Sequence, residues 1–407
     1  MLNKLFLIIT TGLPGIHKLI FFFFIESYLG VFTLGEFSND YYIIQFFIIF
    51  NALGLSSLLM VNLPKKNALD EIKNYSSIIN VTMLFGLLIS FPLIVLLYET
   101  NILYTIFDAY LLLVGMSGNL IVRHYFLALK MYKHIFIFDL LVLLFFLLVF
   151  TITYFLEVKI SILELVAIIY LGSYISFLTY YKMKVLRNII PKKEIYLALN
   201  VGLVNAFSAG VYFVLIPLVN KKLGVEYAGL IGIIFTISSL LVLIPRAMSM
   251  YFLPDISKNI LDYKSTEKIY TRYKYINIFS LFSLFIVSLL LLFSFNYYFL
   301  DRLFQLKDAN IIYILFMSSV LISQLSLAPS NLLIAFEKAE VLRNIGFKLL
   351  IWYLFIYVVL EILDVQHFIF VYLFISSMLL ANLYRFYILN KIVKRIFLEN
   401  KKGIGIE

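Results

Sequence analysis

Residues 134–156 read HIFIFDLLVLLFFLLVFTITYFL, and Asp139 is the only Asp, Glu, Lys or Arg in this stretch. About 20 consecutive apolar residues are enough for a helix to cross the hydrocarbon core of a bilayer. Backbone N–H and C=O groups find no water in that core, so a spanning segment must pair them within itself. The stretch therefore predicts a transmembrane α-helix.

The same pattern recurs along the whole chain of 407 residues. Hydrophobic residues make up 63% and charged residues 14%, with a mean hydropathy of +1.00, whereas soluble domains are about half apolar and about a quarter charged. No small-residue cleavage site follows the first apolar run, so we expect it to be retained as a helix. We expect an all-α integral membrane protein with about twelve transmembrane helices, at roughly 5–29, 39–62, 75–98, 108–129, 134–156, 160–181, 195–219, 227–250, 273–297, 309–335, 343–363 and 366–389.

The basic residues indicate which side of the membrane each connection faces. If the N-terminus lies inside, 27 of the 33 Lys and Arg residues fall in or beside cytoplasmic connections, five fall on the opposite side, and Lys18 lies within a span. This imbalance follows the positive-inside rule. It predicts an even number of spans with both termini in the cytoplasm.

Composition also excludes several kinds of site. The chain has no cysteine, which rules out disulfides, iron–sulfur clusters and thiolate zinc sites. The net charge of +10 comes from short basic runs between apolar stretches, a pattern typical of anchoring at the membrane surface and not of nucleic-acid binding. We expect no cofactor and no metal site, because the histidines lack the spacing of metal ligands; they are His17, His124, His134 and His367.

The polar segment 182–194, KMKVLRNIIPKKE, divides the expected spans into six and six. We therefore expect an N-terminal lobe at 1–181, a cytoplasmic linker at 182–194, a C-terminal lobe at 195–389 and a cytoplasmic tail at 390–407. Two six-span lobes of the same orientation are related as parallel repeats, which commonly enclose a central cavity.

Both lobes begin with a similar motif. Leu34-Gly35-Glu36-Phe37 after the first span and Leu223-Gly224-Val225-Glu226-Tyr227 after the seventh each predict a tight Gly-containing turn before the next span. Pro245-Arg246 closes the expected eighth span and is followed by Tyr251-Phe252-Leu253-Pro254.

With these motifs, its length, its twelve spans and its basic middle loop, the chain resembles the Wzx-type polysaccharide (O-antigen) flippases of the MOP superfamily. MATE drug antiporters and lipid II flippases belong to the same superfamily. The turns are similar to the family pattern "lG…e.fG.y", although Ser38 stands where its second glycine is expected. The resemblance implies two six-helix lobes in the bacterial inner membrane. It also implies transfer of an undecaprenyl-pyrophosphate-linked oligosaccharide, an O-antigen or capsule repeat unit, to the outer leaflet without covalent chemistry.

The implied partners are this lipid-linked oligosaccharide, membrane lipids, a coupling cation (H+ or Na+), and the polymerase and chain-length proteins of the same pathway. A glycan and a pyrophosphate cross hydrocarbon only if protein groups replace their hydration. We therefore expect a wet, cationic cavity at membrane depth.

Charges inside spans point to the residues of that cavity. Such a charge costs about 2.5–3.5 kcal/mol at mid-helix and usually faces the bundle interior. Lys18 is the clearest candidate, beside His17 in the first span; it could instead pair with a carboxylate inside the bundle or extend to the headgroups. Further cationic candidates, each of which could instead reach the headgroups from a span end, are Arg123, Arg246, Arg343 and Lys348.

Polar residues complete the expected path. Asp139 is expected to form a structural ion pair with Arg123 across the turn at 130–134. Neutral candidates in spans seven and ten, which could equally form hydrogen bonds between helices, are Asn205, Gln324 and Asn331. Bends are expected in these two spans at Gly202, Gly210, Pro217 and Pro329.

Two alternative functions remain open at this stage. A cation-coupled drug exporter similar to MATE proteins requires carboxylates within the membrane, and most acidic residues here stand at span ends, with Asp139 as the nearest exception. An O-antigen polymerase or ligase, which is an enzyme, usually has one large outer loop, whereas connections such as 99–108 and 298–308 are short. The sequence also lacks the GxxxxGK[ST] nucleotide-binding motif.

Overall fold

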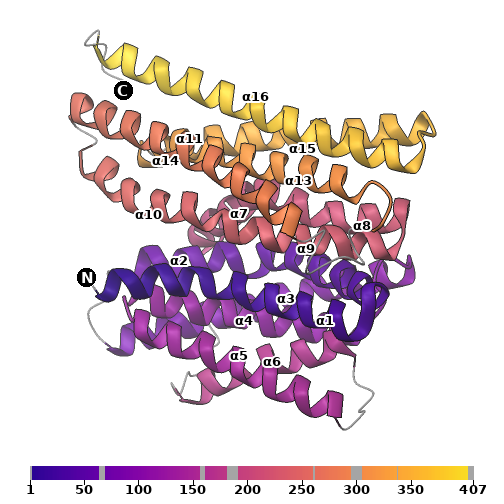
Figure 1. Ribbon diagram of the computed structural model, residues 1–407. Coiled ribbons are helices and arrows are strands. Elements are labelled where there is room, and N and C mark those ends of the chain that lie inside the picture. Colours follow the sequence, from indigo (N-terminus) through magenta and orange to yellow (C-terminus); the bar gives the residue numbers. More distant parts are fainter. Residues whose placement is uncertain are drawn as a thin grey trace. The chain divides into compact units, whose positions relative to one another are not determined.

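The computed structural model describes residues 2–63, 69–155, 161–180, 191–259, 262–294, 305–336 and 338–401. Every regular element within these ranges is a helix, as the sequence predicts (Figure 1). Contacts divide the chain into two compact units, Met1–Lys221 and Lys222–Glu407. The division therefore falls after the seventh expected span, and not in the polar segment 182–194, within which helix α7 begins.

The first two expected spans lie within one long element, α1 (Leu2–Ile48), which turns sharply at Gly30. Gly30 has φ 88° and ψ 170°, a backbone conformation that residues with a side chain rarely adopt. The second helix continues through a π-helical turn, η1 (Ile49–Leu53), into α2 (Gly54–Asn62). The turn expected at Gly35 is wrong, because Gly35 is buried inside this second helix and the chain reverses five residues earlier.

The turn between α8 and α9 repeats this geometry. Segments 29–31 and 223–225 both read Leu-Gly-Val, and their central glycines have φ values of 88° and 99° with ψ values of 170° and 173°. A second glycine, buried in the helix that follows, comes five residues after each turn, as Gly35 and Gly229. The motif shared by the two turns is therefore Leu-Gly-Val-x-x-x-Gly, and its first copy lies at 29–35 and not at 34–37.

The first unit continues with four long helices and one broken segment. The long helices are α3 (Leu69–Glu99), α4 (Phe107–Ala128), α5 (Tyr132–Phe155) and α6 (Ile162–Tyr180). The broken segment consists of α7 (Lys192–Asn205), a π-helical turn η3 (Ala206–Gly210) and α8 (Val211–Leu223). The bend expected in span seven is thus confirmed.

The second unit contains α9 (Val225–Leu241), α10 (Leu243–Lys258), α11 (Tyr263–Ser294), α13 (Ala309–Ser323), a 3₁₀ turn η5 (Gln324–Ser326), α14 (Leu327–Ala335), α15 (Ala339–Ile362) and α16 (His367–Lys401). The turn η5 precedes Pro329, so the bend expected in span ten is confirmed. Pro245-Arg246 does not close a helix, because the break lies earlier, at Val242, and α10 runs on to Lys258. Residues 390–401, expected as tail, continue α16.

Ten helical stretches within the described residues are long and apolar enough to cross a membrane, which indicates a multi-pass membrane protein. One of them, Gly12–Ala52, includes the turn at Gly30 and so contains two of the expected spans. The expected span at 195–219 is not among the ten.

Small residues allow α4 and α6 to pack closely. A Cβ placed on Gly118 of α4 would lie 2.3–2.5 Å from the ring of Tyr174 on α6, and one on Gly115 would lie 2.6 Å from the backbone nitrogen of Leu171. Close helix approach through small residues is a common way to associate helices in lipid, where the solvent provides no hydrophobic driving force. The α4–α6 pair is therefore a rigid part of the first unit.

Gly118→Ala should lower the thermal unfolding midpoint of the detergent-solubilised protein, because the added methyl must displace a buried aromatic ring at a cost of about 1–3 kcal/mol. Gly172→Ala on α6 is the matched control, since a Cβ at Gly172 meets no atom within 4 Å. The control should leave the midpoint unchanged or raise it, because alanine favours a helix over glycine. Equal midpoints for the two variants would contradict the close packing.

Candidate functional site

Lys18 lies in the interior of the first unit beside two tyrosines. Its side chain is half-buried, and its Nζ lies 5.1 Å and 5.0 Å from the ring centroids of Tyr41 and Tyr42. Both rings are buried. An ammonium near the negative faces of aromatic rings is stabilised by about 0.5–2 kcal/mol, the larger value applying where water is excluded.

The turn at Gly30 creates this contact. Lys18 stands twelve residues before the turn, and Tyr41 and Tyr42 stand eleven and twelve residues after it. The two helices of α1 run back along each other, so positions at equal distances from the turn meet. The edge of Phe22 packs against both tyrosine rings at centroid distances of 6.0 Å and 5.9 Å, which fixes the aromatic wall beside the ammonium.

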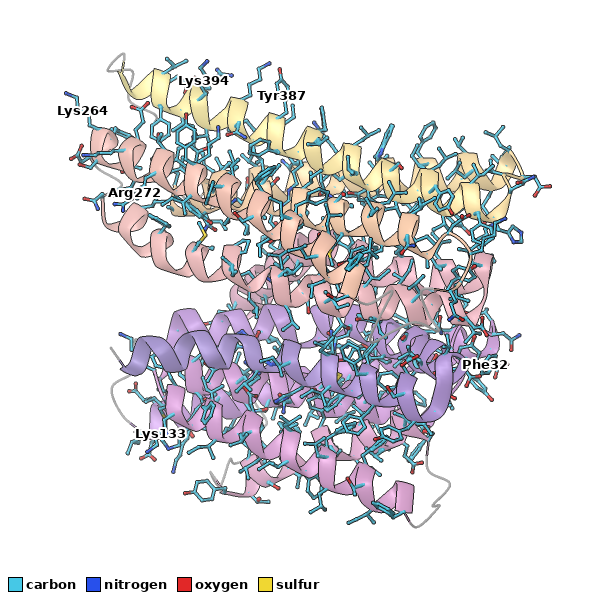
Figure 2. All side chains as sticks on the ribbon, viewed as in Figure 1. Phe32, Lys133, Lys264, Arg272, Tyr387 and Lys394 are labelled. Carbon is cyan, nitrogen blue, oxygen red and sulfur yellow. The ribbon has the colours of Figure 1, made fainter. Side chains whose placement is uncertain are left out.

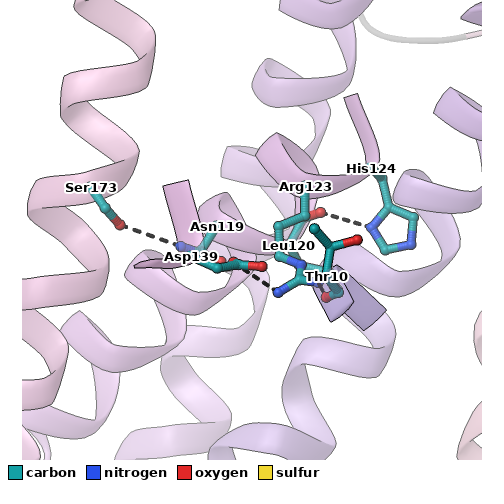
Figure 3. Close-up of polar contacts among 7 residues, drawn as sticks. All are labelled: Thr10, Asn119, Leu120, Arg123, His124, Asp139 and Ser173. Atoms are coloured by element: carbon teal, nitrogen blue, oxygen red, sulfur yellow. Dashed lines mark hydrogen bonds and ion pairs between the residues drawn. The ribbon is translucent and has the colours of Figure 1, made fainter. Parts of the chain in front are cut away.

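Arg123 joins three helices of the first unit (Figure 3). Its Nη1 donates to Oδ1 of Asp139 on α5 at 2.9 Å, and its Nη2 donates to the backbone oxygen of Thr10 on α1 at 2.8 Å. The side chains of Arg123 and Asp139 are 13% and 4% exposed. The expected ion pair is confirmed, and Arg123 points into the unit instead of toward the headgroups.

The two histidines near Arg123 have different surroundings. His17 is buried, lies near enough to Arg123 to feel its charge, and packs against Phe21 with ring centroids 6.3 Å apart. Its Nε2 is buried and has no hydrogen-bond partner among the described residues. His124 is half-buried, and its Nδ1 lies 2.8 Å from the backbone oxygen of Leu120 (Figure 3). His17 and Arg123 both lie in the first unit, and Arg123 is paired with Asp139.

Two further carboxylates are buried in the first unit. Glu26 is 3% exposed, and Asp40 is 2% exposed. Asp40 accepts hydrogen bonds from the backbone N–H groups of Tyr104 and Thr105 at 3.1 Å each. Both acids stand at the ends of expected spans. The sharp turn at Gly30 places them inside.

Asparagines extend the network around Asp40. Nδ2 of Asn39 donates to Asp40 at 3.0 Å and to the backbone oxygen of Ile102 at 2.7 Å. Nδ2 of Asn220, at the end of α8, donates to Asn39 at 3.1 Å and to the hydroxyl of Tyr104 at 2.9 Å. The start of the second α1 helix, the 102–105 connection and the end of α8 are thereby linked. No group of three or more His, Asp or Glu side chains in the described part of the chain could hold a metal ion.

The neutral candidates of the second unit stabilise its broken helices. Nδ2 of Asn331 on α14 donates to Ser249 on α10 at 2.6 Å and to the Tyr273 hydroxyl on α11 at 3.2 Å. The backbone oxygen of Gln324, which the turn η5 frees from the helix, accepts from Nδ2 of Asn277 at 3.0 Å. Hydrogen bonds between helices therefore account for part of this path. Asn205 is half-buried at the end of α7, directly before η3.

The remaining cationic candidates lie in the second unit, on α10 and α15. Arg246 is exposed on α10, one turn before Ser249. Arg343 is half-buried and Lys348 exposed, both on α15. Lys348 shares its helix face with the exposed Trp352 and Phe355, and Arg246 and Lys348 make no ion pair among the described residues.

No family model and no curated protein sequence matches the chain. Solved structures do match it over nearly its whole length. An inward-facing multidrug resistance MATE family transporter of the MOP superfamily has a TM-score of 0.71 at 13% identity, covering 97% of this chain and 96% of that one. An outward-facing form has a TM-score of 0.63 at the same identity and coverage. The chain has the fold of MOP superfamily transporters.

A third similar structure is a MOP superfamily transporter from Pyrococcus furiosus, with a TM-score of 0.65, 13% identity, and coverage of 98% of this chain and 96% of that one. Its description states that the reverse polarity of its binding pocket suggests a different function. At such identities the likeness establishes the fold, whereas the substrate must be argued from the side chains of this chain.

Replacing one partner of the Arg123–Asp139 pair should destabilise the protein strongly. A buried charge left without its partner costs about 3–5 kcal/mol, whereas replacing both partners by apolar residues of similar volume is often tolerated. Arg123→Met and Asp139→Leu should therefore each lower the thermal midpoint more than the double variant does. Arg395→Ala is the control, because Arg395 is 80% exposed in its pair with Glu399, and such pairs contribute little. Additive losses in the double variant would show that the two side chains are not coupled.

Proposed function

We propose that this protein is a flippase that moves an undecaprenyl-pyrophosphate-linked oligosaccharide, an O-antigen or capsule repeat unit, across the bacterial inner membrane. It works by alternating access and performs no covalent chemistry. The MOP transporter fold supports movement of a substrate across the bilayer. The pattern of basic residues supports twelve spans with both termini in the cytoplasm.

The proposed substrate class is argued from Lys18 and the two tyrosines beside it, Tyr41 and Tyr42. A lysine inside a span is retained against a cost of about 2.5–3.5 kcal/mol at mid-helix, and this one lies in the interior of the first unit against aromatic rings. The charge of Arg123 is balanced by Asp139. We assign Lys18 to an anionic substrate because its ammonium lies beside the ring faces of Tyr41 and Tyr42 inside this unit.

The chemistry of the region suits a glycan joined to a pyrophosphate. An ammonium is a compact point charge with three donors, which an oxyanion of the pyrophosphate can accept. The tyrosines beside it offer apolar ring faces against which a sugar ring can pack, together with hydroxyls that can hydrogen-bond to it. The lipid tail can stay in the bilayer while the polar head passes through the protein.

Buried acids support a coupling cation, either H+ or Na+, as a second partner. Glu26, Asp40 and Asp139 are each at most 3% exposed in the first unit. The same observation favours the alternative function, a cation-coupled drug exporter, because a cationic drug would be attracted by carboxylates. However, Asp40 already accepts hydrogen bonds from two backbone N–H groups, and Asp139 is already paired with Arg123.

The first test combines deletion of the gene in its native host with single-site rescue. Deletion should abolish the surface glycan and cause complete lipid-linked repeat units to accumulate inside the cell. Lys18→Arg should restore export in part, because it keeps the charge. Lys18→Gln should reduce the export rate roughly 10- to 100-fold, the effect of losing one hydrogen bond to a charged group. Lys133→Gln, at an exposed lysine of the first unit, is the matched control.

The outcome separates the candidate functions. Complete units that reach the outer face but remain unpolymerised would identify a polymerase and refute the flippase. An unchanged glycan with new drug sensitivity would identify an exporter. Full rescue by Lys18→Gln, in a protein that still inserts and folds, would remove Lys18 from the substrate path.

A further inference from the structure

The second unit carries a row of basic residues on one face of α11. Lys264, Lys268 and Arg272 follow one another at intervals of four residues, and all three are exposed. Figure 2 labels Lys264 and Arg272. Residues at this spacing lie side by side along a helix. A shallow, open hollow extends along the row and is lined by Lys264, Glu267, Lys268, Thr271, Arg272 and Tyr275. With one acidic residue among its lining, the hollow has a net charge of +2.

The basic row continues directly into the lipid-facing side of the same helix. Tyr275, Phe279, Phe282, Leu290 and Phe293 are all more than 60% exposed. At about 100° per residue, these positions and the three basic ones fall within roughly 80° of arc. An exposed row that is entirely apolar over this length faces hydrocarbon. The basic residues therefore look outward in the direction of the surrounding lipid.

The opposite face of α11 is buried in the unit. Thr266, Tyr270 and Tyr273 occupy it at the basic end, and Leu281 and Leu284 occupy it further along, where they pack against Leu321 of α13. The first turn is closed by Asp262, whose Oδ1 accepts from the backbone N–H groups of Lys264 and Ser265 at 3.1 Å and 3.2 Å. The basic part of α11 is therefore ordered helix.

Helix rise places the basic row at the depth of lipid headgroups. From Tyr275 to Phe293 the helix rises about 27 Å, close to the roughly 30 Å of a hydrocarbon core. Arg272 lies about 5 Å beyond Tyr275 along the axis, and Lys268 lies about 10 Å beyond it. The headgroup layer is about 5–8 Å thick on each side, and long basic side chains extend toward it. Arg272 is thus level with the headgroups, and Lys268 can reach them.

Helix α16 supports the row at the same end of the unit (Figure 2). The hydroxyl of Tyr270 donates to Oδ1 of Asn390 at 3.1 Å, and Nζ of Lys274 lies 5.7 Å from the ring centroid of Phe386. Lys391 and Lys394 of α16 are exposed there as well. Two adjacent helices thus leave the apolar band together with basic outer faces.

We propose that Lys268 and Arg272 on α11 bind the phosphate headgroups of anionic phospholipids in the leaflet at that end of the second unit. Lys264, about 16 Å beyond Tyr275 along the helix axis, adds positive charge outside the headgroup layer. The row shares its face with side chains that contact hydrocarbon, so lipid molecules of the bulk bilayer reach it directly. Arg272 can hold a phosphate with two parallel hydrogen bonds, and the lysines add positive charge beside it. Neither Lys268 nor Arg272 forms an ion pair among the described residues.

Binding of phosphatidylglycerol and phosphatidylcholine to the full-length purified protein in detergent tests this site, with native mass spectrometry as the readout. Each basic residue near an anionic surface contributes about fivefold to binding. The triple variant Lys264→Gln, Lys268→Gln, Arg272→Gln should therefore bind phosphatidylglycerol about 25- to 100-fold more weakly, the lower value being the effect of Lys268 and Arg272 alone. Phosphatidylcholine binding should not change. Added salt should weaken phosphatidylglycerol binding more in the unsubstituted protein than in the triple variant.

The matched control removes the same charge from three separate helices by Lys73→Gln, Lys133→Gln and Lys192→Gln, all at exposed positions of the first unit. This control should keep most of the phosphatidylglycerol affinity, and both variants should keep the original thermal midpoint. If both variants lost phosphatidylglycerol affinity equally, the effect would come from net charge alone, and the proposed site would be wrong. Unchanged affinity in the α11 variant would overturn it as well. If farnesyl pyrophosphate, and not phosphatidylglycerol, binds in a manner that requires the row, then the row serves a pyrophosphate lipid and the proposal is wrong.

Discussion

The interior of the first unit depends on pairing charges that have left water. Arg123 lies inside the first unit, where an unpaired guanidinium would be costly. It donates hydrogen bonds to the carboxylate of Asp139 on α5 and to the backbone oxygen of Thr10 on α1. Each of these partners comes from a different helix, so the pairing holds α1, α4 and α5 in one arrangement. The close contact between α4 and α6 at Gly118 then joins α6 to these three helices.

Breaks in the helices recur at related places of the two halves. Gly30 and Gly224 turn the chain with the same backbone angles, and a break follows about 18 residues after each, at η1 and at Val242. A broken helix leaves backbone groups without their usual partners. Asn277 satisfies one such oxygen, that of Gln324, in the second unit. Breaks of this kind allow helices to bend with little loss of pairing, because neighbouring groups take up the freed backbone groups.

Two groups of basic residues serve different tasks in the functions proposed above. Lys18 is half-buried in the first unit beside two aromatic rings, where its charge is less screened than at an exposed position. Lys264, Lys268 and Arg272 lie on an exposed face, where screening is stronger and several charges must act together. The first arrangement favours selection of one anionic group, and the second favours attraction to a charged membrane surface.

The sequence by itself determined the helical membrane class, nearly all helix positions, the Arg123–Asp139 pair and the bends of spans seven and ten, because apolar length, proline and nearby opposite charge act locally. It misplaced the first turn, since Gly30 and Gly35 are equally plausible as isolated glycines. Only the tertiary structure decided that Glu26 and Asp40 are buried, that Lys18 meets Tyr41 and Tyr42, and that α7 and α8 belong with the first unit. Each of these features depends on contacts between residues that are far apart in the sequence. A local sequence pattern does not determine such contacts.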